Sequence, residues 1–317
     1  MAKFCRFALL LMGATLVLPA DAAPKRKATP KPTAVAAARK KPATPQPATP
    51  DPREFHLLKD GELPLKARGA IVLDALTGQT LYEKNAEAPQ FPASTTKIMT
   101  ALLVIEEGDL EKEVEIVQED SDVGESSLSV KPGDRFTRRQ MLYGLMLKSA
   151  NDVAHSLGRD NAGTMPLFAE KMTRRAHELG ATRTNFMNPH GLHHVAHFTT
   201  PRDLALITRA AMQQPLFRRI VSTQKHPWVT VTGVPIRELF NHNKLLTRFE
   251  GCTGVKTGFT RPAMNVLASA ALRGNREVIA AVMHSDRPGQ WEDSMQLLSY
   301  GLENEAALKK LNSSQPP

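Results

Sequence analysis

Residues 91–108 read FPASTTKIMTALLVIEEG and place Ser94 three positions before Lys97, at the start of a long apolar run. The apolar side chains that follow, up to Ile105, recur at helical spacing, so this stretch predicts a helix that begins at Ser94. Residues three apart on a helix have Cβ atoms roughly 5–6 Å apart, which lets Lys97 reach the Ser94 hydroxyl. Serine is also a favoured helix N-cap, so the spacing alone leaves two interpretations open: a cap, or a nucleophile beside its base.

The same spacing occurs a second time, at Ser222 and Lys225. There His226 and Pro227 follow directly, and a residue before proline is disfavoured in a helix. A helix therefore cannot continue past this lysine, and we interpret the second pair as incidental.

Two further motifs follow the first along the chain. Ser149-Ala150-Asn151 is the only Ser-x-Asn, and Lys256-Thr257-Gly258 is the only Lys-Thr-Gly. Each is a weak signal alone, because a Ser/Asn pair in a loop usually bonds backbone groups and Lys-Thr-Gly suits the end of a strand. The order Ser-x-x-Lys, Ser-x-Asn, Lys-Thr-Gly is far more specific than any one of them.

That order resembles the penicillin-recognising serine enzymes, the penicillin-binding proteins and serine β-lactamases, over about residues 60–305. Within this group the chain is similar to the D-alanyl-D-alanine carboxypeptidases, which are low-molecular-mass penicillin-binding proteins. The supporting stretches are GAIVLDALTGQTLYEKN (69–85), FPASTTKIMTALL (91–103), LMLKSANDVA (145–154), NPHGL (188–192), TTPRDLA (199–205), NHNKLL (241–246) and GVKTGFT (254–260).

The resemblance implies a role for each motif residue. Ser94 would be the nucleophile, Lys97 its general base, and Ser149 the group that passes a proton to the departing D-Ala. The substrate would be bound by Asn151, Lys256, Thr257, Gly258 and Phe259. The implied activity is the removal of the terminal D-Ala from peptidoglycan stem peptides through an acyl-serine, with β-lactam antibiotics as inhibitors and with no metal or cofactor.

Three other functions remain open for the same residues. A DD-endopeptidase would cut peptidoglycan cross-links, and some related endopeptidases have a phenylalanine where this chain has Phe259. A serine β-lactamase is disfavoured because Glu238 lies in Glu-Leu-Phe-Asn, which lacks the leucine-asparagine pair of a deacylating motif. A non-catalytic wall-binding protein is disfavoured because all three motifs are intact.

The order of elements predicts the fold class. Strand patterns lie at both ends of the chain and helical patterns in its middle, which suggests an α/β (α+β) protein with an antiparallel sheet packed against a helical region. The resemblance implies the same β-lactamase/transpeptidase-like architecture. We expect a strand pair over 69–85, helices over 137–157 (interrupted near 148–151), 167–179, 201–213 and 294–311, and strands over 266–272 and 277–284.

The start of the chain has the features of an export signal. Residues 1–22 combine a basic start, a short apolar core and a small-residue cleavage site, and the apolar run is too short to span a bilayer comfortably. We therefore expect an exported protein, periplasmic or cell-wall associated, whose mature chain keeps only Cys252 and forms no internal disulfide. The catalytic domain is expected at residues 53–317, without a C-terminal β domain.

The positive charge is concentrated before that domain. The whole sequence holds 41 Lys and Arg against 32 Asp and Glu, a net charge of +9, whereas residues 53–317 hold 32 against 30. Nucleic-acid binding needs a basic surface on the folded domain, so we exclude it. Residues 23–52 are rich in Pro, Ala and Lys, which predicts a disordered linker with a weak electrostatic contact to an anionic wall or membrane surface.

Two further groups of residues resemble functional sites, but we interpret both as ordinary structural or surface residues. The spacing of the histidines between 190 and 197 suits metal ligands on a helix, but Pro189 and Gly191 favour a loop, so we expect no metal. Arg261 and Arg287 lie near the edge of the predicted sheet in sequence, and either could help bind the substrate carboxylate, but we expect both to be solvated surface side chains.

Overall fold

The computed structural model describes residues 57–58 and 61–303, all of which belong to one compact unit. The predicted signal peptide and linker lie outside these residues, as does the end of the chain from residue 304. The predicted domain boundaries therefore stay a prediction. None of the helices in the described ranges combines the length and apolar character that crossing a membrane requires.

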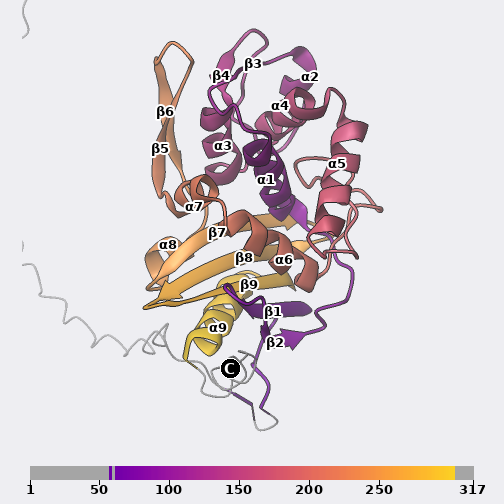
Figure 1. Ribbon diagram of the computed structural model, residues 1–317, viewed down its shortest axis with the longest axis vertical. Coiled ribbons are helices and arrows are strands. Elements are labelled where there is room, and N and C mark those ends of the chain that lie inside the picture. Colours follow the sequence, from indigo (N-terminus) through magenta and orange to yellow (C-terminus); the bar gives the residue numbers. More distant parts are fainter. Residues whose placement is uncertain (1–56, 59–60, 304–317) are drawn as a thin grey trace, which may run out of the picture. The chain divides into compact units, whose positions relative to one another are not determined.

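A five-stranded antiparallel sheet forms the base of the unit (Figure 1), in the order β2-β1-β9-β8-β7. Its first two strands, β1 (Gly69–Asp74) and β2 (Thr80–Lys84), open the described chain. The other three, β7 (Cys252–Thr260), β8 (Met264–Arg273) and β9 (Arg276–Ser285), come from its far end. The prediction of an antiparallel sheet built from both ends of the chain is confirmed, and β7 is left as an edge strand.

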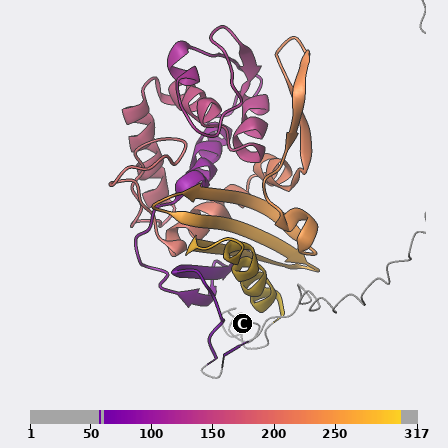
Figure 2. The same ribbon diagram turned by 180° about the vertical axis from the view of Figure 1, so that it is seen from behind.

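Each face of the sheet is covered by helices, because successive side chains of a strand point to opposite faces. On β8, Leu267 and Ala271 pack in the cluster that contains α9 (Gly289–Glu303). Ala268 and Ala270 pack in the larger cluster on the opposite face. The two views in Figures 1 and 2 show α9 below the sheet and the longer helices above it.

The helical region stands on that second face. Its longer members are α1 (Lys97–Glu107), α3 (Arg138–Leu147), α4 (Asn151–Ala162), α5 (Met165–Glu178), α6 (Pro201–Met212) and α7 (Pro215–Ser222). Helix α1 is buried along most of its length and contacts α3, α4, α5, α6 and α7, so it is the axis of this region. The prediction of an all-helical region is confirmed.

The predicted element boundaries agree with the structure at most positions. The interruption near 148–151 separates α3 from α4, the helix predicted over 201–213 is α6 with Thr200 as its N-cap, and the strand pair over 69–85 is present. Helix α9 starts at Gly289, five residues before the predicted start, and its predicted end lies outside the described residues.

Several elements, most of them short, were not predicted from the sequence. They are β3 (Glu113–Glu115) with β4 (Arg135–Thr137), β5 (Lys225–Val229) with β6 (Pro235–Phe240), α2 (Gln118–Ser121), α7 and α8 (Leu245–Arg248). The β5–β6 hairpin projects beside α3 in Figure 1. Two stacked ring pairs hold it there, Trp228 on Phe136 and His226 on Tyr143.

The start of α1 differs from the prediction. Residues Ala93–Thr96 form a 3-10 turn, η1, and α1 begins only at Lys97, with Thr96 at its N-cap position. Ser94 caps neither element, since no side-chain hydrogen bond closes either start. The helix-cap interpretation of Ser94 is therefore wrong.

Candidate active site

The three sequence motifs meet at one cleft of about 480 Å³. Ser94 comes from η1, Ser149 from the turn between α3 and α4, and the residues of the third motif from the edge strand β7. Thr257, Gly258 and Phe259 line the cleft with the two serines. Segments separated by more than 150 positions in the sequence are thus brought to a single site.

Lys97 lies beneath this cleft with its side chain fully buried. Its Nζ is 3.1 Å from Ser94 Oγ, 2.7 Å from Asn151 Oδ1 and 2.6 Å from the carbonyl oxygen of His190. A neutral amine has two N–H donors and one lone pair. The two closer partners can only accept hydrogen bonds, so they take both N–H groups and leave the lone pair for the Ser94 hydroxyl.

The electrostatics of the site favour that neutral amine. Burial, together with the positive charge of Lys256, holds the pKa of Lys97 well below its ordinary value. Burial alone lowers the pKa of Lys256 to about 7. Asp152 and Glu125 act on Lys97 in the opposite direction, and they are weaker than the first two effects.

The backbone around Ser94 leaves room for an oxyanion. A Cβ placed on Gly258 would lie 2.9 Å from the Ser94 backbone nitrogen, so only glycine lets β7 come this close to η1. The first N–H groups of a helical turn lack partners within it, and they favour negative charge. The arrangement can place a developing oxyanion between η1 and β7.

The loop of residues 188–192 (NPHGL) supports η1, the turn that carries Ser94. Gly191 has a left-handed backbone (φ 88°), and a Cβ there would lie 1.8 Å from the Ala93 carbonyl oxygen. The neighbouring carbonyl of Pro189 accepts a hydrogen bond from Thr100 on α1. The loop therefore fixes the position of η1, and it also positions the His190 carbonyl, which accepts a hydrogen bond from Lys97.

Ser149 has a strained backbone. Its φ is 61°, a region in which residues other than glycine are uncommon, and its side chain is almost completely buried. Strain of this kind persists only where surrounding contacts impose it, and it is concentrated at functional sites. Asn151, two residues later, is the first residue of α4 and contacts Lys97.

Arg287 is exposed, as predicted, and it also lines the cleft together with Thr257, which favours the alternative role in binding a carboxylate. Arg261 is not among the lining residues. The sequence analysis also missed Ser126, His242 and Lys244, which line the cleft too. The only signal for the last two was the stretch NHNKLL.

The histidines lie in a loop, as predicted. His190 and His197 are buried, and burial lowers their pKa values to about 2 and about 3, so both are neutral. His197 Nε2 pairs with the Thr96 hydroxyl, and its Nδ1 accepts from the Met187 N–H. Within residues 57–58 and 61–303, no group of three or more His, Cys, Asp or Glu is arranged to hold a metal ion.

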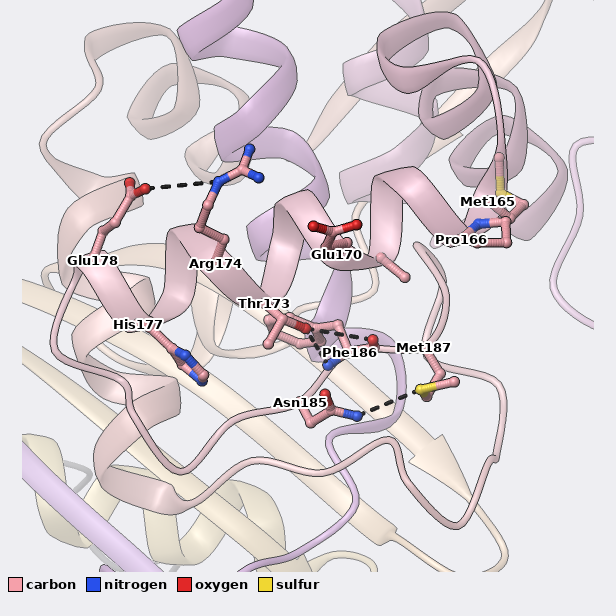
Figure 3. Close-up of a pocket in the computed structure, with 11 residues that line it drawn as sticks. Met165, Pro166, Glu170, Thr173, Arg174, His177, Glu178, Asn185, Phe186 and Met187 are labelled. Atoms are coloured by element: carbon pink, nitrogen blue, oxygen red, sulfur yellow. Dashed lines mark hydrogen bonds and ion pairs between the residues drawn. The ribbon is translucent and has the colours of Figure 1, made fainter.

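A larger hollow of about 770 Å³ lies elsewhere, along α5 and residues 185–187 (Figure 3). Its lining includes Glu170, Arg174 and His177, but no residue of the three motifs. Volume alone therefore does not identify the site. Glu238 and Cys252 take no part in the site either. Glu238 pairs with Lys225 on the surface, and burial raises the pKa of the Cys252 thiol to about 11.

The fold and this site together define a serine peptidase of the penicillin-binding class, and comparison with known proteins agrees. A family profile of D-alanyl-D-alanine carboxypeptidases matches residues 58–287. The chain therefore belongs to the D-alanyl-D-alanine carboxypeptidase family.

Individual relatives are similar over the same region. D-alanyl-D-alanine carboxypeptidase DacF of Bacillus subtilis is 32% identical over 235 residues, 73% of this chain and 60% of the relative. D-alanyl-D-alanine carboxypeptidase DacB2 of Mycobacterium tuberculosis is 34% identical over 237 residues, 73% of this chain and 80% of the relative. The crystal structure of a Streptomyces DD-transpeptidase is 35% identical with a TM-score of 0.71, and it covers 75% of this chain and 97% of its own.

Proposed function

We propose that this protein removes the terminal D-Ala from peptidoglycan stem peptides, with Ser94 as the nucleophile and Lys97 as its general base. The observation that carries the proposal is the set of contacts made by Lys97 Nζ. Two acceptors hold its N–H groups and the third neighbour is the Ser94 hydroxyl at 3.1 Å. A serine hydroxyl is a poor nucleophile until such a base takes its proton.

In the first step, Lys97 takes the Ser94 proton while Oγ attacks the carbonyl carbon of the penultimate D-Ala. The negative charge moves to the carbonyl oxygen, which the backbone N–H groups of Ser94 and Phe259 stabilise. One such donor is typically worth ~3–4 kcal/mol of barrier. The close approach that Gly258 permits between β7 and η1 supports this assignment.

In the second step, the tetrahedral intermediate collapses. The bond to the terminal D-Ala breaks. Ser149 gives its hydroxyl proton to the departing amine and takes back the proton that Lys97 removed from Ser94, so both groups are restored while the acyl group stays on Ser94. Asn151 holds Lys97 and orients the substrate amide. Water then attacks the acyl-serine while Lys97 takes its proton; the ester bond breaks, the proton passes to Ser94 Oγ, and the shortened peptide leaves as the carboxylic acid.

The terminal carboxylate of the substrate is bound at the other side of the cleft. Lys256 and Thr257 hold it, and we add Arg287, which lines the same cleft and has no ion pair within the described part of the chain. An arginine guanidinium suits a carboxylate because it can donate two parallel hydrogen bonds. β-lactam antibiotics, which carry a carboxylate beside a reactive amide, acylate the same serine.

The test is incubation with purified pentapeptide muropeptides, followed by mass analysis. The expected product is the tetrapeptide muropeptide together with one equivalent of free D-Ala. Opening of cross-linked dimers without release of free D-Ala would show the endopeptidase, and rapid turnover of penicillin would show the β-lactamase. Intact muropeptides with no acylated protein would contradict the proposal.

The location of the enzyme is part of the proposal. Residues 1–22 direct export and are removed, and residues 23–52 tether the domain of residues 53–317, with their positive charge in weak contact with an anionic wall or membrane surface. The relatives named above are D-alanyl-D-alanine carboxypeptidases and a DD-transpeptidase, and a peptidoglycan substrate supports a periplasmic or wall-associated site of action. N-terminal sequencing of the exported protein tests the cleavage, and an unprocessed Met1 would contradict it.

A further inference from the structure

Residues 124–130, which form neither helix nor strand, reach one side of the cleft through Ser126 and are called the cleft-wall segment. Ser126 in this cleft-wall segment lines the cleft beside Ser94 and Ser149. Glu125 and Ser129 both have left-handed backbones, with φ values of 66° and 57°. A segment of this kind keeps its shape only if contacts with the rest of the protein impose it.

Part of the support comes from Asn151, already described as a partner of Lys97. Its backbone N–H donates to the Ser126 carbonyl at 2.7 Å, and its Nδ2 donates to the Gly124 carbonyl at 3.0 Å. The Ser126 hydroxyl in turn donates to the Lys148 carbonyl at 3.0 Å. The first half of the segment is thus tied to the turn that carries Ser149.

The second half is tied to Asp152, whose carboxylate is completely buried. It accepts from the Ser127 hydroxyl at 2.6 Å, from the Leu128 N–H at 3.0 Å and from the Val130 N–H at 3.3 Å. The Val153 N–H donates to its other oxygen at 2.9 Å. All of these donors are neutral groups, and three belong to the cleft-wall segment. Only a group that accepts at every position, as a carboxylate does, satisfies them.

We propose that Asp152 is a positioning residue of the reaction, whose carboxylate holds residues 124–130 as a wall of the cleft and keeps Ser126 aligned with Ser149. The proposal rests on the function proposed above. Asp152 touches neither substrate nor Ser94; it acts through the wall and through the field at Lys97. Consecutive residues, Asn151 and Asp152, thereby couple the general base to the shape of the cleft.

The electrostatic effect of Asp152 on Lys97 should be visible as a shift of the pH profile, which a purely structural residue would not cause. The charged groups acting on Lys97 are Lys256 on β7, Asp152 on α4 and Glu125 in the cleft-wall segment, while His190 and His197 beside it are neutral. The negative charge of Asp152 raises the pKa of Lys97. Removal of that charge lowers the pKa further, so the base is free at a lower pH.

The chain offers a matched control. Asp120 is also a completely buried carboxylate, and it accepts from the Val117 N–H at 3.0 Å and pairs with His155 and Arg159. It contacts α4 one turn after Asp152, but it forms no hydrogen bond with residues 124–130 and does not act on Lys97. Replacement of Asp120 should therefore lower the stability of the protein without changing the cleft.

The experiment compares Asp152→Asn, Asp120→Asn and Ser127→Ala by the rate of penicillin acylation as a function of pH. We expect Asp152→Asn to lower the maximal rate by ~10–10²-fold, the size of effect that follows misplacement by about 1 Å. We also expect its rate to rise at a lower pH than in the wild type. Ser127→Ala should lower the rate without moving the pH profile, and Asp120→Asn should change the melting temperature alone.

Equal rates and pH profiles for Asp152→Asn and Asp120→Asn would overturn the proposal. If Asp152→Asn does not fold, Ser127→Ala decides, because a wild-type rate in that variant would overturn the role of the wall. Failure of the proposed function is a separate result: the wild-type protein itself would then not be acylated at any pH.

Discussion

The chain contains Ser-x-x-Lys twice, and the two copies have opposite environments. Lys97 is fully buried, with Asn151 and a backbone carbonyl holding its amine beside Ser94. The side chain of Lys225 is 67% exposed and pairs with Glu238 on the β5–β6 hairpin. Ser222 ends α7 and donates to a backbone carbonyl of its own helix.

The difference shows that spacing brings a serine and a lysine within reach but does not make a base. An exposed lysine, with a pKa near ~10.4, is protonated at neutral pH and has no lone pair to offer. Burial removes the hydration of the charge, and a second buried cation, Lys256, lowers the pKa further. Such a site costs stability, and the three hydrogen-bond partners around Lys97 offset part of that cost.

The largest expected effect separates the two lysines directly. Lys97→Ala should lower the rate of penicillin acylation by at least the ~10²–10⁴-fold typical of a lost general base. Lys225→Ala should leave the rate unchanged, because an exposed ion pair contributes little to stability and nothing to the cleft. Acylation rate and melting temperature are measured on the same preparations. A near-normal rate in Lys97→Ala would remove the distinction between the two pairs.

The support beneath the active pair is tested by two glycines with similar backbones. Gly191→Ala should lower acylation by about 10²-fold, because its new Cβ collides with the Ala93 carbonyl and displaces the turn that carries Ser94. Gly233→Ala has the same left-handed φ but nothing within 4 Å of its Cβ. It should cost only backbone strain, visible as a small fall in melting temperature. Equal acylation rates in the two variants would contradict the supporting role of the loop.

We expect a smaller effect on activity from a change on the side of the cleft where the substrate carboxylate binds. Arg287→Ala should lower kcat/KM for a peptide ending in D-Ala-D-Ala by roughly tenfold, the value of one charge-assisted hydrogen bond. Arg261→Ala removes an arginine that does not line the cleft, and it should have no effect. Steady-state release of D-Ala measures both. Amidation of the peptide's terminal carboxylate should abolish the difference between wild type and Arg287→Ala; a difference that persists would contradict the assignment.

The smallest effect is one of stability. The pKa of Lys256 is about 7 in the folded protein, below that of an unfolded lysine, so the folded state binds fewer protons between pH 7 and about 10.4. Stability from this group therefore rises with pH across that window. Lys256→Met should raise the melting temperature at pH 7 and flatten its rise towards pH 10, whereas Lys225→Met should do neither. An unchanged slope in Lys256→Met would show that burial does not perturb this lysine.

The sequence predicted most of the fold because the large elements carry strong local patterns. Strands β1, β8 and β9 are apolar runs between turn residues, and α6 has a capping threonine followed by proline. The β5–β6 hairpin was missed because most of its side chains are exposed and Pro227 interrupts β5. Trp228 and Leu239 anchor it to helices that are distant in sequence.

The candidate site likewise has residues that the sequence predicted and residues that it did not. The three motifs could be identified because each places its reactive side chains within three residues of one another, and their roles stay predictions. Ser126 could not be identified, and Arg287 could not be distinguished from Arg261, since neither Ser126 nor Arg287 has a local pattern and only the folding of distant segments brings them to the cleft. Burial of Lys97 follows from the packing of α1 inside the helical region, which its own sequence indicates only as an apolar run.

The most direct measurement is the mapping of the penicillin adduct. The protein is labelled with penicillin, digested with trypsin, and its peptides are sequenced by mass spectrometry. We predict a single adduct on Ser94, formed in the wild type and in Ser222→Ala and absent in Ser94→Ala. An adduct on Ser222, or a folded wild-type protein with no adduct, would contradict the assignment of Ser94 and Lys97 as nucleophile and base.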